Sequence, residues 1–199
     1  MRADRGDRTR VVHPLFQTEN SGSIPTSPLQ LQFFRCRLDV ALRLNRAWHS
    51  RLPELSEMTV RIKHGRGYAA QFDGVYYAIA IWSTPAARKL DDGTRYELRR
   101  FAIADDAPKN TASRMLGWMI RELKREARWS KAISYQDTEA HSGTIYRATG
   151  WIPASRSQSG IGWQRSGMKP HWRRWCRSNA EQSAAPKVRW EYILRHEDA

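Results

Sequence analysis

Three residues whose side chains can exchange protons, His49, Asp137 and His141, draw attention by their positions in the chain. Asp137 directly follows KAISYQ (131–136), a predicted strand, and ligands of open α/β sheets bind at the carboxyl ends of strands. A carboxylate there could accept a proton from an amine, or it could simply cap the next helix. His49, in AWHSR, titrates near neutrality and could act as a base, a ligand or a phosphate donor. Both histidines could equally be structural.

The same three residues offer the donor types of a metal centre. With a tyrosine, His49, Asp137 and His141 could form an iron site of the histidine–carboxylate kind. They show no short spacing such as HxD, so metal is the minor alternative to acid–base chemistry. Trp48, next to His49, could stack on a base extruded from a nucleic acid, or it could pack in the core.

A basic segment near the C-terminus predicts contact with a polyanion. Residues 140–180 contain seven Lys or Arg and no Asp or Glu. Arginines engage phosphates, and tryptophan faces stack on bases or on arginine. The alternative is a solvated tail whose tryptophans fold back on the domain. The residues expected to contact nucleic acid, which is DNA if the family resemblance described below holds, are Arg165, Lys169, Trp172, Arg173, Arg174, Trp175 and Arg177.

The composition agrees with such a partner and excludes other classes. The 199 residues include 34 Lys or Arg and 20 Asp or Glu, a net charge of +14, which favours binding to nucleic acid. No apolar run approaches the ~20 residues that span a bilayer, and the N-terminus lacks the apolar segment of a secretion signal. The two cysteines form neither a CxxC motif nor a disulfide framework. We therefore expect a reduced, cytoplasmic protein without a membrane partner.

The elements that must position these residues alternate between strands and helices. Asp73-Gly74, between two strand-like runs, is a strong two-residue turn signal that predicts a hairpin. The apolar stripe after Asn110 is typical of an amphipathic helix, and Asn110 is a good N-cap candidate. Alternation with an antiparallel start predicts an α/β protein with one mixed sheet and helices on both faces. The expected order is a strand (33–42), a helix (44–55), a hairpin (68–83), a strand (96–104), a helix from 111, a strand (131–136), a short helix (143–149), a strand from 151 and a last strand (187–194).

The same patterns in the sequence predict the domain organisation. We expect a flexible arm over 1–32, a catalytic core over 33–155, a basic Trp/Arg-rich insertion over 156–186, and a final core strand with its tail over 187–199. Within the core, Glu97 and Arg99 share a face of their predicted strand, so an ordinary ion pair between them is the simplest expectation.

This order of elements resembles the GNAT acetyltransferase fold. GNAT enzymes carry a tyrosine on a short helix, a few residues before a glycine and an aromatic residue, and here IYRATGW supplies Tyr146, Gly150 and Trp151. The resemblance implies that Tyr146 lies near the donor thioester and can protonate the leaving thiolate. The alternative is an aromatic side chain that packs the helix on the sheet.

The resemblance also indicates a donor site before the long helix. GNAT enzymes bind the pyrophosphate of acyl-CoA with a Gly-rich loop there, whereas this chain has APKNTAS (107–113), without glycine. A helix N-terminus remains to hold the anionic part of acetyl-CoA or another acyl donor. The residues available for this are Lys109, Asn110, Thr111, Ser113 and Arg114.

Three longer stretches are similar to the Mom family of phage DNA-modification proteins, which is itself GNAT-like. They are NRAWHSRLP, ELRRFAIADDAPKNTASRMLG and SYQDTEAHSGTIYRATGW, within roughly residues 40–155. The resemblance implies a cytoplasmic enzyme of the infected host cell that converts adenine in double-stranded DNA to a carbamoylmethylated form, protecting it from restriction. Asp137, with His49, would then manage the proton of the adenine amine, and Tyr146 would serve the leaving group. Two alternatives stay open: an acetyl-CoA-dependent N-acetyltransferase of a protein, an RNA or a small amine, and a DNA-binding module without chemistry.

Overall fold

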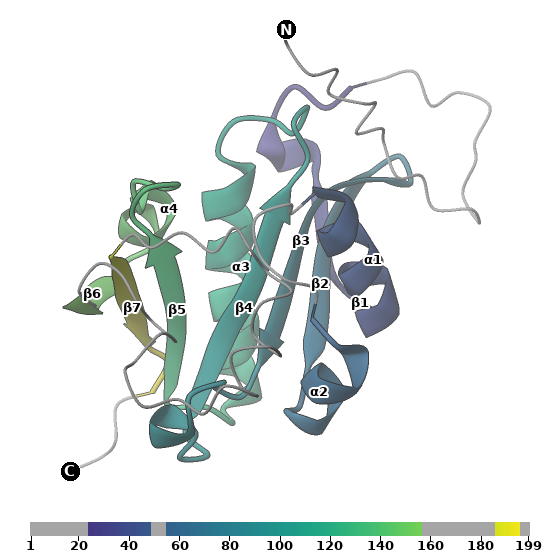
Figure 1. Ribbon diagram of the computed structural model, residues 1–199. Coiled ribbons are helices and arrows are strands. Elements are labelled where there is room, and N and C mark those ends of the chain that lie inside the picture. Colours follow the sequence, from purple (N-terminus) through teal and green to yellow (C-terminus); the bar gives the residue numbers. More distant parts are fainter. Residues whose placement is uncertain (1–23, 49–54, 157–185, 196–199) are drawn as a thin grey trace, which may run out of the picture.

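The computed structural model describes residues 24–48, 55–156 and 186–195, and they build one mixed β-sheet (Figure 1). Its strand order is β1-β2-β3-β4-β5-β7-β6, antiparallel throughout except for the parallel pair β4 and β5. This confirms the expected mixed sheet. The strands are β1 (Gln32–Cys36), β2 (Arg66–Phe72), β3 (Val75–Ser83), β4 (Arg95–Ile103), β5 (Lys131–Asp137), β6 (Ile152–Arg156) and β7 (Lys187–Ile193).

Helices cover both faces of the sheet, as the alternation predicts. Helices α1 (Leu38–Trp48) and α2 (Glu57–Ile62) pack on one face, where Leu44 meets Ile79 and Ile81. Helices α3 (Thr111–Glu126) and α4 (Thr144–Ala148) pack on the other. Two 3-10 turns, η1 (Pro28–Gln30) and η2 (Arg88–Leu90), complete the described elements. Among the described helices, none is long and apolar enough to cross a membrane.

The hairpin β2–β3 lies in the middle of the sheet. Asp73 and Gly74 both have positive φ, 47° and 74°, as the tight turn between twisted strands requires. Every residue of β3 is buried, because the strand has neighbours on both sides and helices above and below. The hairpin prediction is therefore confirmed.

The N-terminal boundaries differ from the sequence prediction. The predicted strand 33–42 ends at Cys36 in the structure, and the helix begins at Leu38 rather than at residue 44. The reason is tertiary: a Cβ on Gly67 of β2 would lie 2.8 Å from the Cβ of Ala41. Glycine there lets α1 pack directly on the sheet. Residues 38–42, whose apolar character led to the strand prediction, are therefore helical.

Part of the segment predicted as a flexible arm (1–32) has defined structure. Residues 24–31 are described, and Leu31 is buried in the core. Ser27 and Gln30 form a capping box around η1, in which the Ser27 hydroxyl accepts a hydrogen bond from the Leu29 N–H. This local hydrogen bonding orders a segment whose composition is typical of a loop. Residues 1–23 lie outside the described part of the chain.

Strands β4 and β5 separate towards their carboxyl ends (Figure 1). Their parallel pairing runs from Arg95 with Lys131 to Leu98 with Ser134 and stops there, although both strands continue. At this point Ile81 of β3 pairs with Arg100 and Trp82 pairs with Leu98, so Arg99 is the extra residue of a β-bulge. A bulge bends its strand, and the bend leaves the edges of β4 and β5 facing each other across a gap in the pairing.

Candidate functional site

The hydroxyl of Tyr146 lies where β4 and β5 separate. Tyr146 is buried in α4, and its hydroxyl oxygen is 2.9 Å from Oγ of Ser134, the last residue of β5 that pairs with β4. Its ring stacks on Trp190 at a centroid distance of 5.3 Å and meets Trp151 edge-on at 5.5 Å. These contacts hold the ring in place, so Tyr146 does pack its helix on the sheet. Its hydroxyl group nevertheless points to the end of the β4–β5 pairing.

Burial keeps this phenol protonated. Desolvation raises the pKa of Tyr146, and the hydrogen bond with Ser134 opposes the shift only in part. A buried tyrosine that is neutral at physiological pH can donate a proton or a hydrogen bond to a group that develops negative charge. The neutral hydroxyl can thus serve as a donor, while the same burial makes its phenolate unfavourable unless a hydrogen bond stabilises it.

The loop between β5 and α4 is held by hydrogen bonds from buried side chains. Trp190 Nε1 donates to Gln136 Oε1 at 2.7 Å, and Gln136 Nε2 donates to the carbonyl of His141. Gly143, just before α4, has φ +75°, and a Cβ there would lie 2.6 Å from Gln136 Oε1. Glycine is therefore required at the point where the chain enters the helix that carries Tyr146.

Asp137 is the last residue of β5, at the strand's carboxyl end as predicted. Its Oδ1 accepts a hydrogen bond of 3.0 Å from the backbone N–H of Glu139, and its carbonyl accepts one of 3.0 Å from the N–H of His141. These hydrogen bonds close the turn after β5, whereas the residue at the start of α4 is Gly143. Asp137 therefore does not cap the next helix, and its role as a base stays a prediction. The side chain of His141 is exposed.

The remaining candidates near α1 fall at the edge of the described chain. Trp48 ends α1 and is half-buried against the core of that face. His49 lies outside the described residues. Within residues 24–48, 55–156 and 186–195, no group of three or more His, Cys, Asp and Glu side chains could hold a metal ion, so the iron site gains no support.

The start of α3 differs from the expected side-chain cap. Asn110 has φ 66° and its side chain makes no capping hydrogen bond, because this left-handed conformation replaces the extended backbone of an ordinary N-cap. Asparagine tolerates this region better than most residues, so Asn110 takes a conformation that glycine would favour. The hydroxyl of Thr111 is buried and donates to the carbonyl of Pro108 at 2.7 Å, which turns this predicted donor-binding side chain away from any ligand.

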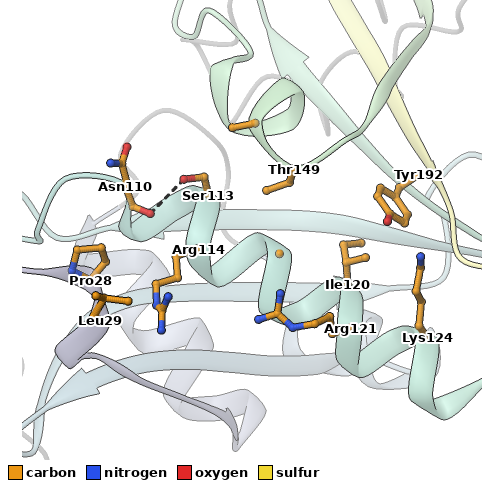
Figure 2. A pocket seen from close by; sticks show the side chains of 12 residues that line it. Pro28, Leu29, Asn110, Ser113, Arg114, Ile120, Arg121, Lys124, Thr149 and Tyr192 are labelled. Carbon is orange, nitrogen blue, oxygen red and sulfur yellow. Dashed lines mark hydrogen bonds between the residues drawn. The ribbon is translucent and has the colours of Figure 1, made fainter.

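A cleft of about 610 Å³ runs along α3 towards α4 (Figure 2). Of the five residues predicted to bind the donor, Asn110, Ser113 and Arg114 line this cleft, whereas Lys109 and Thr111 are not among its lining residues. Their role in donor binding stays a prediction. Sequence analysis missed Arg121 and Lys124. Their spacing from Arg114, seven and ten residues, is the signal that could have placed them on the same helix face. The cleft is lined by Pro28, Leu29, Asn110, Ser113, Arg114, Gly117, Ile120, Arg121, Lys124, Ala148, Thr149 and Tyr192.

The opposite face of the sheet carries charged groups beside the bulge. Glu97 is 6% exposed; its Oε2 accepts a hydrogen bond from the Ala86 N–H at 2.9 Å and its Oε1 lies 3.3 Å from Arg99 Nε. The expected ion pair is confirmed. Burial raises the pKa of Glu97, and burial together with the charge of Arg99 lowers the pKa of Arg100 to about 10. Because of the bulge, Arg99 and Arg100 both lie on the α1–α2 face, which strand alternation alone would not predict.

The predicted DNA-binding residues lie outside the described part of the chain. The segment that contains them joins β6 to β7, which pair with each other at the edge of the sheet. They are Arg165, Lys169, Trp172, Arg173, Arg174, Trp175 and Arg177.

Comparison with solved structures defines the class of fold. The chain is similar to the ribosomal-protein-S18-alanine N-acetyltransferase of Escherichia coli, with TM-score 0.58, 11% identity, and 84% of this chain and 96% of that one covered. It also resembles a GNAT acetyltransferase of Streptococcus pneumoniae, with TM-score 0.56, 10% identity, and 83% of this chain and 99% of that one covered. A GNAT acetyltransferase of Elizabethkingia anophelis with acetyl-CoA bound matches with TM-score 0.52, 9% identity, and 82% of this chain and 98% of that one covered. The protein has the GNAT acetyltransferase fold.

A family model assigns the chain more specifically than the fold does. Residues 72–197 match the model of the Mom protein family, and the chain therefore belongs to that family. No curated protein matches it.

Proposed function

We propose that this protein transfers an acyl-derived group, the carbamoylmethyl group, to the exocyclic amine of adenine in double-stranded DNA, and so protects phage DNA from restriction. The observation that carries the proposal is the buried hydroxyl of Tyr146 at the end of the β4–β5 pairing, in a chain of the Mom family. The net charge of +14 supports a DNA substrate.

The cleft along α3 fits the anionic part of an acyl donor such as acetyl-CoA. Arg114, Arg121 and Lys124 bring three positive charges to it, and no acidic residue is among the lining residues within the described part of the chain. The N-terminus of α3 adds the positive end of a helix of 16 residues. A nucleotide-bearing donor supplies the group to be transferred when it is bound; this chain would hold its phosphates here.

The acceptor must be brought to the reactive residues. The amine of adenine is engaged in base pairing, so the base is extruded from the duplex, and Trp48 at the end of α1 is the stacking candidate. The amine is a weak nucleophile because its lone pair is delocalised into the ring, and it needs a base. Asp137, with His49, takes the proton of this amine, while Tyr146 donates a proton to the leaving group.

The test is mass spectrometry of nucleosides from plasmid DNA that is propagated with the expressed protein. We expect a modified deoxyadenosine whose mass matches carbamoylmethylation, and we expect Tyr146→Phe to lower its yield roughly 10²-fold, the scale of acid–base contributions. Tyr146→Phe keeps the ring that stacks on Trp190, so circular dichroism should show an intact fold.

Two other outcomes would overturn the proposal and define the alternatives. Unmodified DNA together with release of coenzyme A from acetyl-CoA in the presence of a protein, RNA or amine acceptor would indicate an ordinary N-acetyltransferase. Tight DNA binding without either reaction would indicate a binding module on this fold.

A further inference from the structure

The hydroxyl of Ser134 connects Tyr146 to the backbone at the point where β4 and β5 separate. Ser134 is 2% exposed, its Oγ lies 2.9 Å from the hydroxyl oxygen of Tyr146 and 3.3 Å from the carbonyl oxygen of Leu98. Leu98 and Ser134 are also the last pair of residues in the pairing between β4 and β5. The three groups form a chain, Tyr146–Ser134–Leu98, that ends on the backbone beside the bulge.

Counting hydrogens in this chain gives two arrangements. Each hydroxyl has one hydrogen, and a carbonyl has none. If Ser134 donates to Leu98, Tyr146 must donate to Ser134, and its hydrogen is directed into the protein. If Ser134 instead donates to Tyr146, the hydrogen of Tyr146 is released towards another acceptor. Neither arrangement requires movement of a heavy atom.

We propose that Ser134 is a positioning residue that switches the hydroxyl of Tyr146 between a resting and a donating arrangement. The inference rests on the proposed function, in which Tyr146 is the acid. Ser134 does not touch the reacting atoms: it acts by turning its hydrogen to the oxygen of Tyr146 as that oxygen becomes negative, and a hydrogen bond to the charged form stabilises it.

The proton balance of the step is complete with groups already named. The lone pair of the adenine amine forms the new bond to the transferred carbon, and the bond from that carbon to the leaving atom breaks with its electron pair on the leaving atom. The amine proton goes to Asp137, and the proton of Tyr146 goes to the leaving atom. Ser134 then donates its hydrogen bond to the phenolate. After the products leave, Asp137 gives up its proton to water and the phenolate takes one from water, so the protein returns to its starting protonation state.

The experiment measures Tyr146 directly, without relying on turnover. 3-Fluorotyrosine, whose phenol is more acidic than that of tyrosine, is incorporated in the full chain, and Tyr146→Phe identifies the ¹⁹F resonance of residue 146. We expect Ser134→Ala to raise the titration midpoint of this resonance by about one pH unit or more, because the phenolate loses a charge-assisted hydrogen bond. Ser134→Thr keeps the hydroxyl and should restore the midpoint.

Ser83→Ala is the matched control, since it removes another fully buried serine hydroxyl, one that donates to the carbonyl of Thr84. It should leave the midpoint of residue 146 unchanged. An unchanged midpoint in Ser134→Ala would overturn the inference. If Ser134→Ala does not fold, Ser134→Cys, a similar side chain with a weak donor, takes its place, and an unchanged midpoint there overturns the inference equally.

Activity separates this inference from the proposed function. Ser134→Ala should lower the yield of modified deoxyadenosine in the wild-type background and have no further effect in the Tyr146→Phe background, because it acts only through Tyr146. Equal losses in both backgrounds would assign Ser134 a role that does not involve Tyr146. A wild-type protein that modifies no DNA would refute the proposed function, while the ¹⁹F midpoints would still decide whether Ser134 controls Tyr146.

Discussion

Tyr146 and Asp137, the proposed acid and base, also make structural contacts. The ring of Tyr146 packs between Trp190 and Trp151 while its hydroxyl reaches the end of the β4–β5 pairing. The carboxylate of Asp137 accepts a backbone hydrogen bond in the turn after β5. A test of either proposed role therefore needs a substitution that removes the group that exchanges the proton and keeps the structural contact.

For Asp137 that substitution is Asp137→Asn. The amide oxygen can still accept the hydrogen bond from Glu139 N–H, so we expect the melting temperature to change little. The amide cannot take a proton from an amine, so the yield of modified deoxyadenosine should fall roughly 10²-fold. Thermal unfolding and nucleoside mass spectrometry measure the two effects. Retained activity, or a loss of activity that follows a loss of stability, would make Asp137 a structural carboxylate.

The short helix α4 depends on the residue that precedes it. Five residues cannot form a stable helix alone, so α4 is held by Gly143 at its start and by the aromatic contacts of Tyr146. The longer α3 depends on its apolar face, where Met115, Leu116 and Met119 enter the core. Its outer face is thereby free to line the cleft.

Gly143→Ala tests the entry into α4. The left-handed backbone costs about 1–2 kcal/mol in any L-residue, and the Cβ would also press on Gln136 and Trp190, adding about 1–3 kcal/mol of overpacking. We expect a loss of about 2 kcal/mol or more in denaturant unfolding. Gly93→Ala is the control, because Gly93 has φ +79° but open space around it. Equal losses in the two variants would show that Gly143 is not crowded.

Arg121→Ala tests the cleft on α3. If the cleft holds the phosphates of a nucleotide-bearing donor, loss of this charge should weaken binding of coenzyme A about tenfold, measured by calorimetry. Arg125→Ala is the matched control: Arg125 lies on the same helix, pairs with Glu122, and is not among the lining residues of the described cleft. Equal affinity in Arg121→Ala and wild type would remove the cleft from donor binding.

At the scale of the whole molecule, the sheet separates two chemically different faces. The cleft belongs to the α3–α4 face, and the buried pair Glu97–Arg99 belongs to the α1–α2 face beside the bulge. The site where β4 and β5 separate lies between them. In the proposed function, the donor would bind in the cleft on the α3–α4 face, and the DNA would have to reach the strand ends from another side.

The basic insertion supplies a prediction for the full chain. Each arginine that neutralises a phosphate should flatten the log–log dependence of affinity on salt by about 0.9 on duplex DNA. Replacing Arg173, Arg174 and Arg177 by Ala should therefore lower the slope by up to ~2.7. Trp172→Ala should reduce affinity with little change in slope, because stacking releases no counterions. Fluorescence titrations at several salt concentrations measure both effects. An unchanged slope in the triple variant would move the DNA contact elsewhere in the chain.

Local patterns in the sequence determined much of this fold. The Asp73-Gly74 turn, the apolar stripe of α3 and the glycine stop after Tyr146 are short-range signals, because a turn, a helix face or a helix end depends on neighbouring residues. They were enough to predict the mixed sheet, whereas Tyr146 was singled out by the resemblance of IYRATGW to a motif of GNAT enzymes. The charge of the chain likewise follows from composition alone.

The tertiary structure decided what depends on residues far apart in the chain. Glycine at position 67 allows α1 to begin at Leu38, and the bulge at Arg99 is visible only in the register with β3. Ser134 became a candidate because folding brings it 2.9 Å from Tyr146, twelve residues further on. Residues on separate elements meet only when the sheet and helices pack, and the free energy of that packing is spread over the whole core. No local window of sequence contains this information, so the groups around the reactive tyrosine had to be found in the folded protein.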